Sequence, residues 1–361
     1  ARYEAEGMAG IINIILKKDA RIGINGSFDL NVGYPDNYGI SANMNYRKNK
    51  FNFFANYGLN YRQSPGNGAN FQEFQRDDTL FISDQERIRE RSGWNNSIRT
   101  GADYYFNEKS VLTTAFTYRI GKDDNFSEIE YRDYISTRDP ENLMGITTRR
   151  DDELEDETNL EYSLTYRKEF DRKGQEFTAD IRFQDNIEEE NSSIREQFFT
   201  PEFTPTNEAD LRQRSRNAEG EQELIIQLDY VHPISEEGKM EFGYRTSIRN
   251  IDNDFSVEEI ENGEWTTLPN FSNEFAYDER VYAAYAIIGE KWGDFSAQGG
   301  LRAEYSDIIT ELVTTKERNA RDYFNLFPSV FLGYDLPNDN AVQVSYSRRI
   351  NRPRFWYLNP F

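Results

Sequence analysis

The feature that most constrains this chain is a two-residue alternation of apolar and polar side chains, which recurs from near residue 20 to the C-terminus. This period is that of a β-strand with two unlike faces, and no segment of comparable length has helical spacing. The alternation is clearest over residues 22–32, 51–62, 160–167, 176–183, 223–230 and 295–306. The sequence therefore predicts an all-β fold with about thirteen strands.

The predicted connections between these strands fall into two classes. Tight turns are expected at 49–50, 107–110, 171–174, 235–238, 291–293 and 337–340. Long polar loops are expected between them, near 63–85, 121–150, 195–212, 252–274 and 306–320. Short turns at one end and long loops at the other are typical of an antiparallel up-and-down transmembrane β-barrel, with the turns periplasmic and the loops extracellular. A soluble sandwich has no reason to sort its connections in this way.

Aromatic residues gather where the predicted strands meet the tight turns. The set is Tyr46, Phe51, Tyr104, Tyr105, Phe106, Tyr166, Phe170, Phe177, Tyr230, Phe242, Trp292, Phe295 and Tyr334. Amphipathic rings suit the boundary between lipid and water, so this pattern predicts an aromatic girdle. A barrel also explains the mean hydropathy of −0.85, because the inner face of each strand meets water. No run of about 18 apolar residues occurs, so crossing a membrane would have to use strands.

Composition excludes several classes of function. The chain has 42 Lys and Arg against 64 Asp and Glu, for a net charge of −22, which argues against nucleic acid as a partner. It has no cysteine and a single histidine, His232, so thiolate sites and paired-imidazole sites are excluded. Glycine-rich phosphate loops are also absent. We therefore expect no catalytic residues and no enzyme activity.

The first residues carry a motif that resembles a known family. Small residues precede a short apolar strand of the pattern Ile-Asn-Ile-Ile, and the matching positions are Gly7, Gly10, Ile11, Asn13 and Ile14. This stretch resembles the end of the plug domain in TonB-dependent outer-membrane receptors, although Ala9 stands where that family usually has the first glycine of a pair. The resemblance implies that residues 1–18 end a plug domain and that residues 19–361 form the N-terminal part of the barrel.

The C-terminal residues resemble a mid-barrel strand and the following loop of the same family, in its branch related to SusC-like transporters. The matching positions are Arg348, Asn351, Arg352, Pro353, Asn359 and Pro360. The resemblance implies a barrel of about 22 strands, of which this chain holds the first part. It also implies integral location in the bacterial outer membrane and contact with outer-membrane lipid. Further implied partners are a TonB-type coupling protein, and a surface lipoprotein or other subunits of an outer-membrane complex.

Acidic residues are dense between 121 and 160, in the predicted outer loops. Oxygen ligands for a hard cation such as Ca²⁺ are available there, and the candidates are Asp151, Asp152, Glu153 and Asp156. No EF-hand spacing is present, so a solvated run of charge is the favoured interpretation and no cofactor is expected. Charged residues on the inner face are expected to fill the lumen and contact the plug; these are Asp180, Arg182, Arg245, Arg249, Arg302 and Glu304.

The leading functional hypothesis is a TonB-dependent receptor that imports a nutrient, such as an iron chelate, a cobalamin, an oligosaccharide or a peptide. One alternative is a barrel that does not transport and serves as a structural or interaction platform in an outer-membrane complex. Another is a soluble all-β protein such as a propeller, which would show repeats of four strands per blade. No such repeat is found.

Overall fold

The computed structural model describes residues 23–338 and 340–359, and its main feature is one large antiparallel sheet. Its strands are β1 (Gly23–Gly33), β2 (Asn37–Lys48), β3 (Phe51–Arg76), β4 (Thr79–Asn107), β5 (Ser110–Ile135), β6 (Leu143–Glu169), β7 (Glu176–Phe199), β8 (Leu211–Pro233), β9 (Lys239–Glu261), β10 (Glu264–Thr267), β11 (Asn273–Trp292), β12 (Phe295–Leu312), β13 (Glu317–Leu336) and β14 (Asn340–Ser347). Helical structure is limited to η1 (Pro140–Asn142), η2 (Pro269–Phe271) and α1 (Phe355–Leu358) within those residues.

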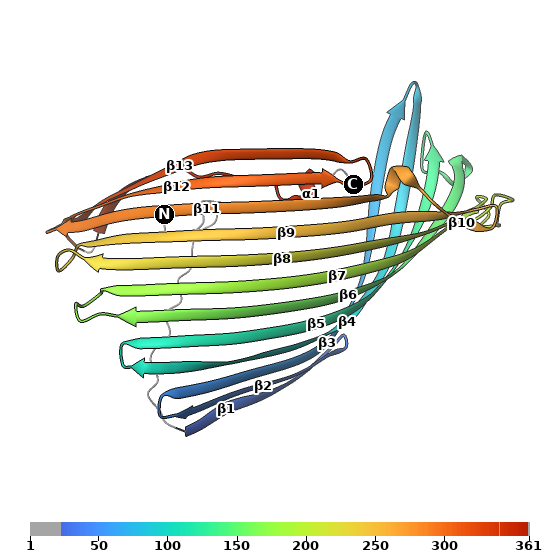
Figure 1. Ribbon diagram of the computed structural model, residues 1–361. Coiled ribbons are helices and arrows are strands. Elements are labelled where there is room, and N and C mark those ends of the chain that lie inside the picture. Colours follow the sequence, from blue (N-terminus) through green and yellow to red (C-terminus); the bar gives the residue numbers. More distant parts are fainter. Residues whose placement is uncertain (1–22, 339, 360–361) are drawn as a thin grey trace.

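Each main strand pairs with the next one along the chain, which makes the sheet an up-and-down meander (Figure 1). Within the described ranges the path runs through thirteen strands, because β10 pairs only with β9 and lies off the path. The curved wall is an open part of a barrel: β1 and β14 form its two edges. The predicted all-β class and up-and-down barrel architecture are confirmed. The predicted plug segment, residues 1–18, lies outside the described residues.

The prediction of long loops at one end of the strands is mostly wrong. Segment 63–85 consists of the ends of β3 and β4 joined by a turn at 77–78, and β5 continues to Ile135. Among the described connections at this end, 200–210 is the longest without a strand, 136–142 is shorter and contains η1, and 313–316 is short. Polar residues above a membrane still pair in ladders because each strand satisfies the backbone groups of its neighbour. Figure 1 shows the result, with the β3–β4 hairpin rising far beyond the sheet.

The two faces of the sheet differ as the alternation predicts. We call the face on which the C-terminal segment lies the inner face, and the opposite one the outer face. The outer face carries a band of exposed apolar side chains, including Ile24, Phe28, Leu30 and Val32 on β1. The inner face is mostly polar, and its buried apolar cluster is Ile251, Phe275, Tyr277 and Phe355.

Ring contacts between strands confirm the predicted aromatic girdle at the tight turns, except for Tyr105. Tyr105 lies on the inner face, with the Arg47 guanidinium 4.8 Å from the centre of its ring. Phe51 lies 4.9 Å from Tyr104 between ring centroids, and Phe106 lies 6.1 Å from Tyr166. Trp292 stacks on Phe295 at 6.1 Å. These contacts place aromatic rings along the tight-turn ends of β3 to β12.

A second aromatic row crosses the outer face above the first. Three of its pairings join Tyr38 to Tyr61, Tyr61 to Trp94, and Tyr282 to Tyr305. Matching aromatic residues at the two levels are eleven residues apart, counted inclusively, in five strands: Phe51–Tyr61, Trp94–Tyr104, Tyr282–Trp292, Phe295–Tyr305 and Phe324–Tyr334. A membrane-spanning strand needs about 9–11 residues when tilted by about 45°. The two rows therefore mark both boundaries of a hydrocarbon layer.

Charged residues appear on the outer face from the register row of Trp94 upward, beginning with Lys122, which lies opposite Trp94. Lys122 forms an ion pair with Asp156 at 3.2 Å, and Arg216 forms one with Glu189 at 3.1 Å. Because such charges avoid hydrocarbon, the sheet above this level lies outside the membrane-spanning part. No helix in the described part of the chain has the length and apolar character needed to span a membrane.

Candidate functional site

A hollow of the inner face lies immediately above the upper aromatic row, over Gly93 on β4. Gly93 is opposite Arg62 on β3 and Asp123 on β5, and because it has no side chain it leaves room for theirs. The hollow has a volume of about 510 Å³. It is lined by Asn60, Arg62, Ser64, Arg91, Ser92, Gly93, Trp94, Asn95, Asp123, Asn125, Glu153 and Glu155. We call it the Gly93 hollow.

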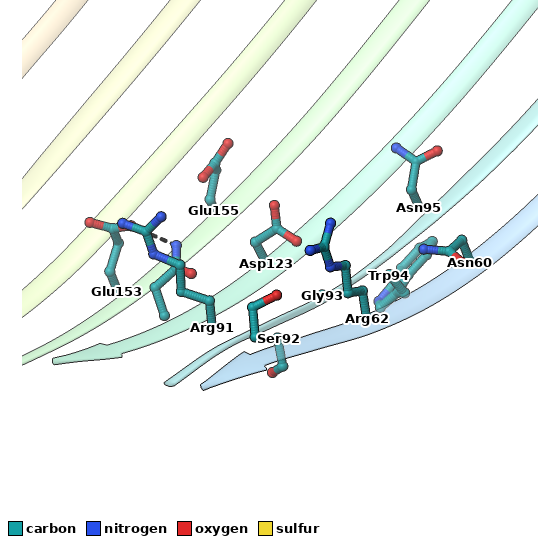
Figure 2. A pocket seen from close by; sticks show the side chains of 12 residues that line it. Asn60, Arg62, Arg91, Ser92, Gly93, Trp94, Asn95, Asp123, Glu153 and Glu155 are labelled. Atoms are coloured by element: carbon teal, nitrogen blue, oxygen red, sulfur yellow. Dashed lines mark hydrogen bonds between the residues drawn. The ribbon is translucent and has the colours of Figure 1, made fainter. Parts of the chain in front are cut away.

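Four strands place the polar groups of the Gly93 hollow (Figure 2). The Asp123 carboxylate occupies the space where a side chain at position 93 would lie: a Cβ atom built on Gly93 would be 1.5 Å from Asp123 Oδ1. Asn125 donates from Nδ2 to Glu153 Oε1 at 2.8 Å, which fixes that carboxylate. Figure 2 shows Arg62 and Arg91 reaching into the same space from β3 and β4. Guanidinium and carboxylate groups thus face one opening, which suits a polar ligand that both donates and accepts hydrogen bonds.

A belt of carboxylates continues from the hollow across the inner face. Strand register places Glu155 opposite both Asp123 and Glu190, and Glu188 opposite both Glu157 and Glu219. We call Glu155, Glu188, Glu190 and Glu219 the acidic belt. Glu155 and Glu190 lie one residue above the register row of the Lys122–Asp156 pair, and Glu188 and Glu219 lie one residue below it. Counted inclusively from Phe177 and Tyr230 of the lower aromatic row, Glu188 and Glu219 are each the twelfth residue, so all four lie outside the eleven-residue membrane-spanning part.

Burial is the main cause of the shifted proton affinities in this region. It raises the pKa of Asp123, and burial together with neighbouring carboxylates raises the pKa values of Glu155, Glu188 and Glu219. The pKa of Glu190 is raised to about 7, first by burial and then by Glu153. Close carboxylates in a partly buried wall disfavour the charged form of one another. Glu190 therefore takes up a proton near neutral pH, so the charge of the acidic belt changes with pH.

The C-terminal motif residues do not continue the sheet beyond Ser347. The chain turns onto the inner face, where Arg352 donates to Glu304, to Ser306 Oγ at 3.2 Å and to Tyr323 Oη at 3.0 Å. Phe355 then packs on Phe275 and Tyr277. We call residues 348–359 the inner segment; its docking on β9, β11, β12 and β13 narrows the lumen at this level.

The other residues of the motif have separate roles. Asn359 accepts a hydrogen bond from Asn273 Nδ2 at 3.0 Å and donates one to Asn253 Oδ1 at 3.2 Å. Arg348 donates to the Leu326 carbonyl oxygen at 3.2 Å, while Asn351 and Pro353 are exposed. Pro360 and the N-terminal motif residues Gly7, Gly10, Ile11, Asn13 and Ile14 lie outside the described residues.

The four candidate calcium ligands are not brought together. They lie on β6 and not in a loop, so they alternate between faces: Asp151 and Glu153 are inner, whereas Asp152 and Asp156 are outer. The outer two are paired, Asp152 with Arg150 at 2.8 Å and Asp156 with Lys122. Across residues 23–338 and 340–359, no three His, Cys, Asp or Glu side chains form a metal-binding group.

The six charged residues predicted for the lumen all lie on the inner face. Arg302 and Glu304 are 3% and 2% exposed and form a 2.8 Å ion pair, while Arg249 pairs with Glu221 at 2.6 Å. The inner-face position of these six residues therefore fits their interpretation as groups that fill the lumen. The upper aromatic row was not predicted from the sequence, although pairs of aromatic residues eleven positions apart, counted inclusively, in the same strand indicate it. The Gly93 hollow carries no local signal, because its residues come from four strands.

Comparisons with known proteins give a matching family and similar folds among solved structures. The model of a family described as outer membrane protein beta-barrel family matches residues 168–361. Among solved structures, the chain is similar to the ferric yersiniabactin uptake receptor FyuA from Yersinia pestis. That similarity has a TM-score of 0.30 and 9% sequence identity, and it covers 91% of this chain and 68% of FyuA. No curated protein sequence matches the chain.

Proposed function

Because this chain belongs to the outer membrane protein β-barrel family, we propose that it forms part of a TonB-dependent receptor that imports a nutrient across the bacterial outer membrane. The observation that carries the proposal is the inner face, which is polar and charged over many strands and has a folded segment docked on it. A lumen of this kind is wet and partly filled, which suits a gated path more than an open pore.

The resemblance of the opening residues to the end of a plug domain supports the same proposal. In such a receptor, ligand binding at the outer end of the lumen precedes movement of the plug, which a TonB-type protein in the inner membrane drives. The Gly93 hollow and the acidic belt lie at the end of the sheet that we assign to the extracellular side. We propose that they contact the ligand and take no part in bond-making chemistry.

The proposal is tested on the full-length protein, with the periplasmic domain of the TonB-type protein from the same bacterium. We expect the two to bind when the receptor is purified in detergent, and binding to be lost when the segment before the plug is deleted. Growth on the imported nutrient should be lost with the same deletion. Full growth after the deletion, with other outer-membrane proteins still co-purifying, would support the platform alternative and overturn import.

A further inference from the structure

Among the described residues, the upper part of β3 is a sheet edge with a partner strand on one side only. β2 pairs with β3 only as far as Arg62, and Gln63 still donates its backbone N–H to the Asp36 carbonyl oxygen at 2.7 Å. From Ser64 to Arg76, β3 pairs with β4 alone within the described residues. Figure 1 shows this hairpin standing beyond the rest of the sheet. An edge of this length presents a row of backbone donors and acceptors to another chain.

The direction of the free backbone groups follows from Gln63. In an antiparallel strand, alternate residues direct their N–H and C=O groups to the same side, so the odd-numbered residues after Gln63 face the edge. Pro65 has no N–H, and the free donors therefore begin at Asn67. They belong to Asn67, Ala69, Phe71, Glu73 and Gln75.

A row of arginines lies on the inner face beside this edge. Arg87, Arg89 and Arg91 occupy alternate positions of β4, and a fourth arginine, Arg62, lies nearby on β3 opposite Gly93. Within the described residues none of these four guanidinium groups forms an ion pair, a hydrogen bond or a ring contact, although the chain has a net charge of −22. We call Arg87, Arg89 and Arg91 the arginine row. Unpaired guanidinium groups bind carboxylates through two parallel hydrogen bonds.

Two glycines leave the space between the free edge and the arginine row without side chains. Gly66 and Gly68 stand between the edge and Arg89 and Arg87, their partners in the register. A Cβ atom built at Gly66 would lie 3.8 Å from Arg89 Nη2, so this guanidinium extends over the glycine. A hollow of about 270 Å³ adjoins it, lined by Gly68, Ala69, Asn70, Gln85, Arg87 and Ile129. Carboxylates are absent from this lining.

From the edge, the arginine row and the glycines together, we infer that this hairpin binds an acidic polypeptide segment in extended conformation, which adds to β3 as a further strand. Side chains at alternate positions of such a strand lie about 6.8 Å apart on one face, the same spacing as alternate residues of β4. Acidic side chains at every second position therefore face the arginines across Gly66 and Gly68. Main-chain hydrogen bonds supply affinity, and the 270 Å³ hollow accepts one side chain.

The test uses the full-length protein in detergent micelles and fluorescently labelled eleven-residue peptides. The probe alternates Glu and Thr. Its controls are a peptide of the same composition with the Glu residues contiguous, an alternating Lys–Thr peptide, and an alternating Glu–Thr peptide with N-methylated backbone at every second residue. We expect only the unmethylated alternating acidic peptide to bind tightly, and its affinity to fall with added salt.

Two variants separate the charge from the edge. Arg87→Gln with Arg89→Gln should weaken binding by at least about tenfold, because two charge-assisted contacts are lost. Ala69→Pro removes a free N–H and should weaken binding while the arginine row stays intact. The matched control, Arg150→Gln with Arg216→Gln, removes the same charge from outer-face ion pairs and should leave binding unchanged.

Several results would overturn the inference. Equal binding of the contiguous or N-methylated peptide would show charge attraction without strand addition. Equal weakening by the outer-face control would assign binding to net charge alone. Tight binding of an oligogalacturonate with failure of the acidic peptide would assign the arginine row to an anionic oligosaccharide. The binding does not depend on transport, so a failed uptake experiment leaves this inference standing, and the reverse also holds.

Discussion

Arg352 forms a buried ion pair with Glu304 across 48 residues of sequence, and this pair fastens the inner segment to β12. Arg302 binds the other oxygen of the same carboxylate, so one Glu lies between two arginines. Their side chains are at most 8% exposed. Because water cannot replace a missing partner there, the energetics depend on which member is removed.

Loss of Glu304 should cost more than loss of Arg352. Glu304→Gln leaves two buried guanidinium groups facing a neutral amide, and we expect a loss of about 3–5 kcal/mol in the free energy of unfolding. Arg352→Met leaves the Arg302–Glu304 pair and should cost less, while exposing residues 353–358 to protease. Asn351→Ala changes an exposed neighbour and serves as the control. Urea unfolding in micelles and limited proteolysis provide the two measurements; equal losses for Glu304→Gln and Arg352→Met would contradict the three-residue cluster.

The two aromatic rows predict how deeply each outer-face residue lies in lipid. Val330 lies between Phe324 and Tyr334 on the outer face of β13, whereas Leu336 lies beyond the lower row; both are exposed. Val330→Arg should destabilise the barrel by about 2–4 kcal/mol and Leu336→Arg by about 0–1 kcal/mol. Unfolding from lipid vesicles measures both. Similar costs for the two variants would place the membrane elsewhere on the sheet.

The hairpin tips should face the cell exterior and the tight turns the periplasm. Since the chain has no cysteine, a single introduced thiol reports on one position. Asp78→Cys at the β3–β4 turn should react with a membrane-impermeant maleimide on intact cells. Arg172→Cys, in the turn between β6 and β7, should react only after the outer membrane is permeabilised. The reverse pattern would invert the orientation.

Glu190 should make the upper wall more stable in mild acid. Its pKa in the folded chain is about 7, above the ordinary value of 4.5, so folding favours the protonated form. Stability from this group is present below pH 4.5 and is lost as the pH rises through about 7. Glu190→Gln should therefore unfold at a higher temperature than the parent at pH 8, with little difference at pH 4.

The neighbouring Glu189 provides a control of opposite sign. The hydrogen bond from Arg216 lowers the pKa of Glu189, so its contribution is present at neutral pH and is lost in acid. Glu189→Gln should therefore lower the unfolding temperature slightly at pH 8 and have no effect in acid. The same direction of change for both variants at pH 8 would contradict the assigned causes.

Much of this protein was determined by local sequence pattern. The alternation in segments such as 176–183 sets which side chains face lipid, because a strand places neighbouring residues on opposite faces whatever its partners. The turn signals set the order of the strands, since a tight turn makes neighbours in the sequence neighbours in the sheet. The aromatic girdle follows from the same two facts.

Tertiary structure alone decided what the inner face can do. Polar composition predicted loops at 63–85 and 121–150, but strand pairing extends far above the membrane because neighbouring backbones satisfy each other there. The Gly93 hollow, the acidic belt and the Arg352–Glu304 pair join residues that register and chain reversal bring together. Sequence spacing carries no record of register between strands, and the sites of this wall depend on register.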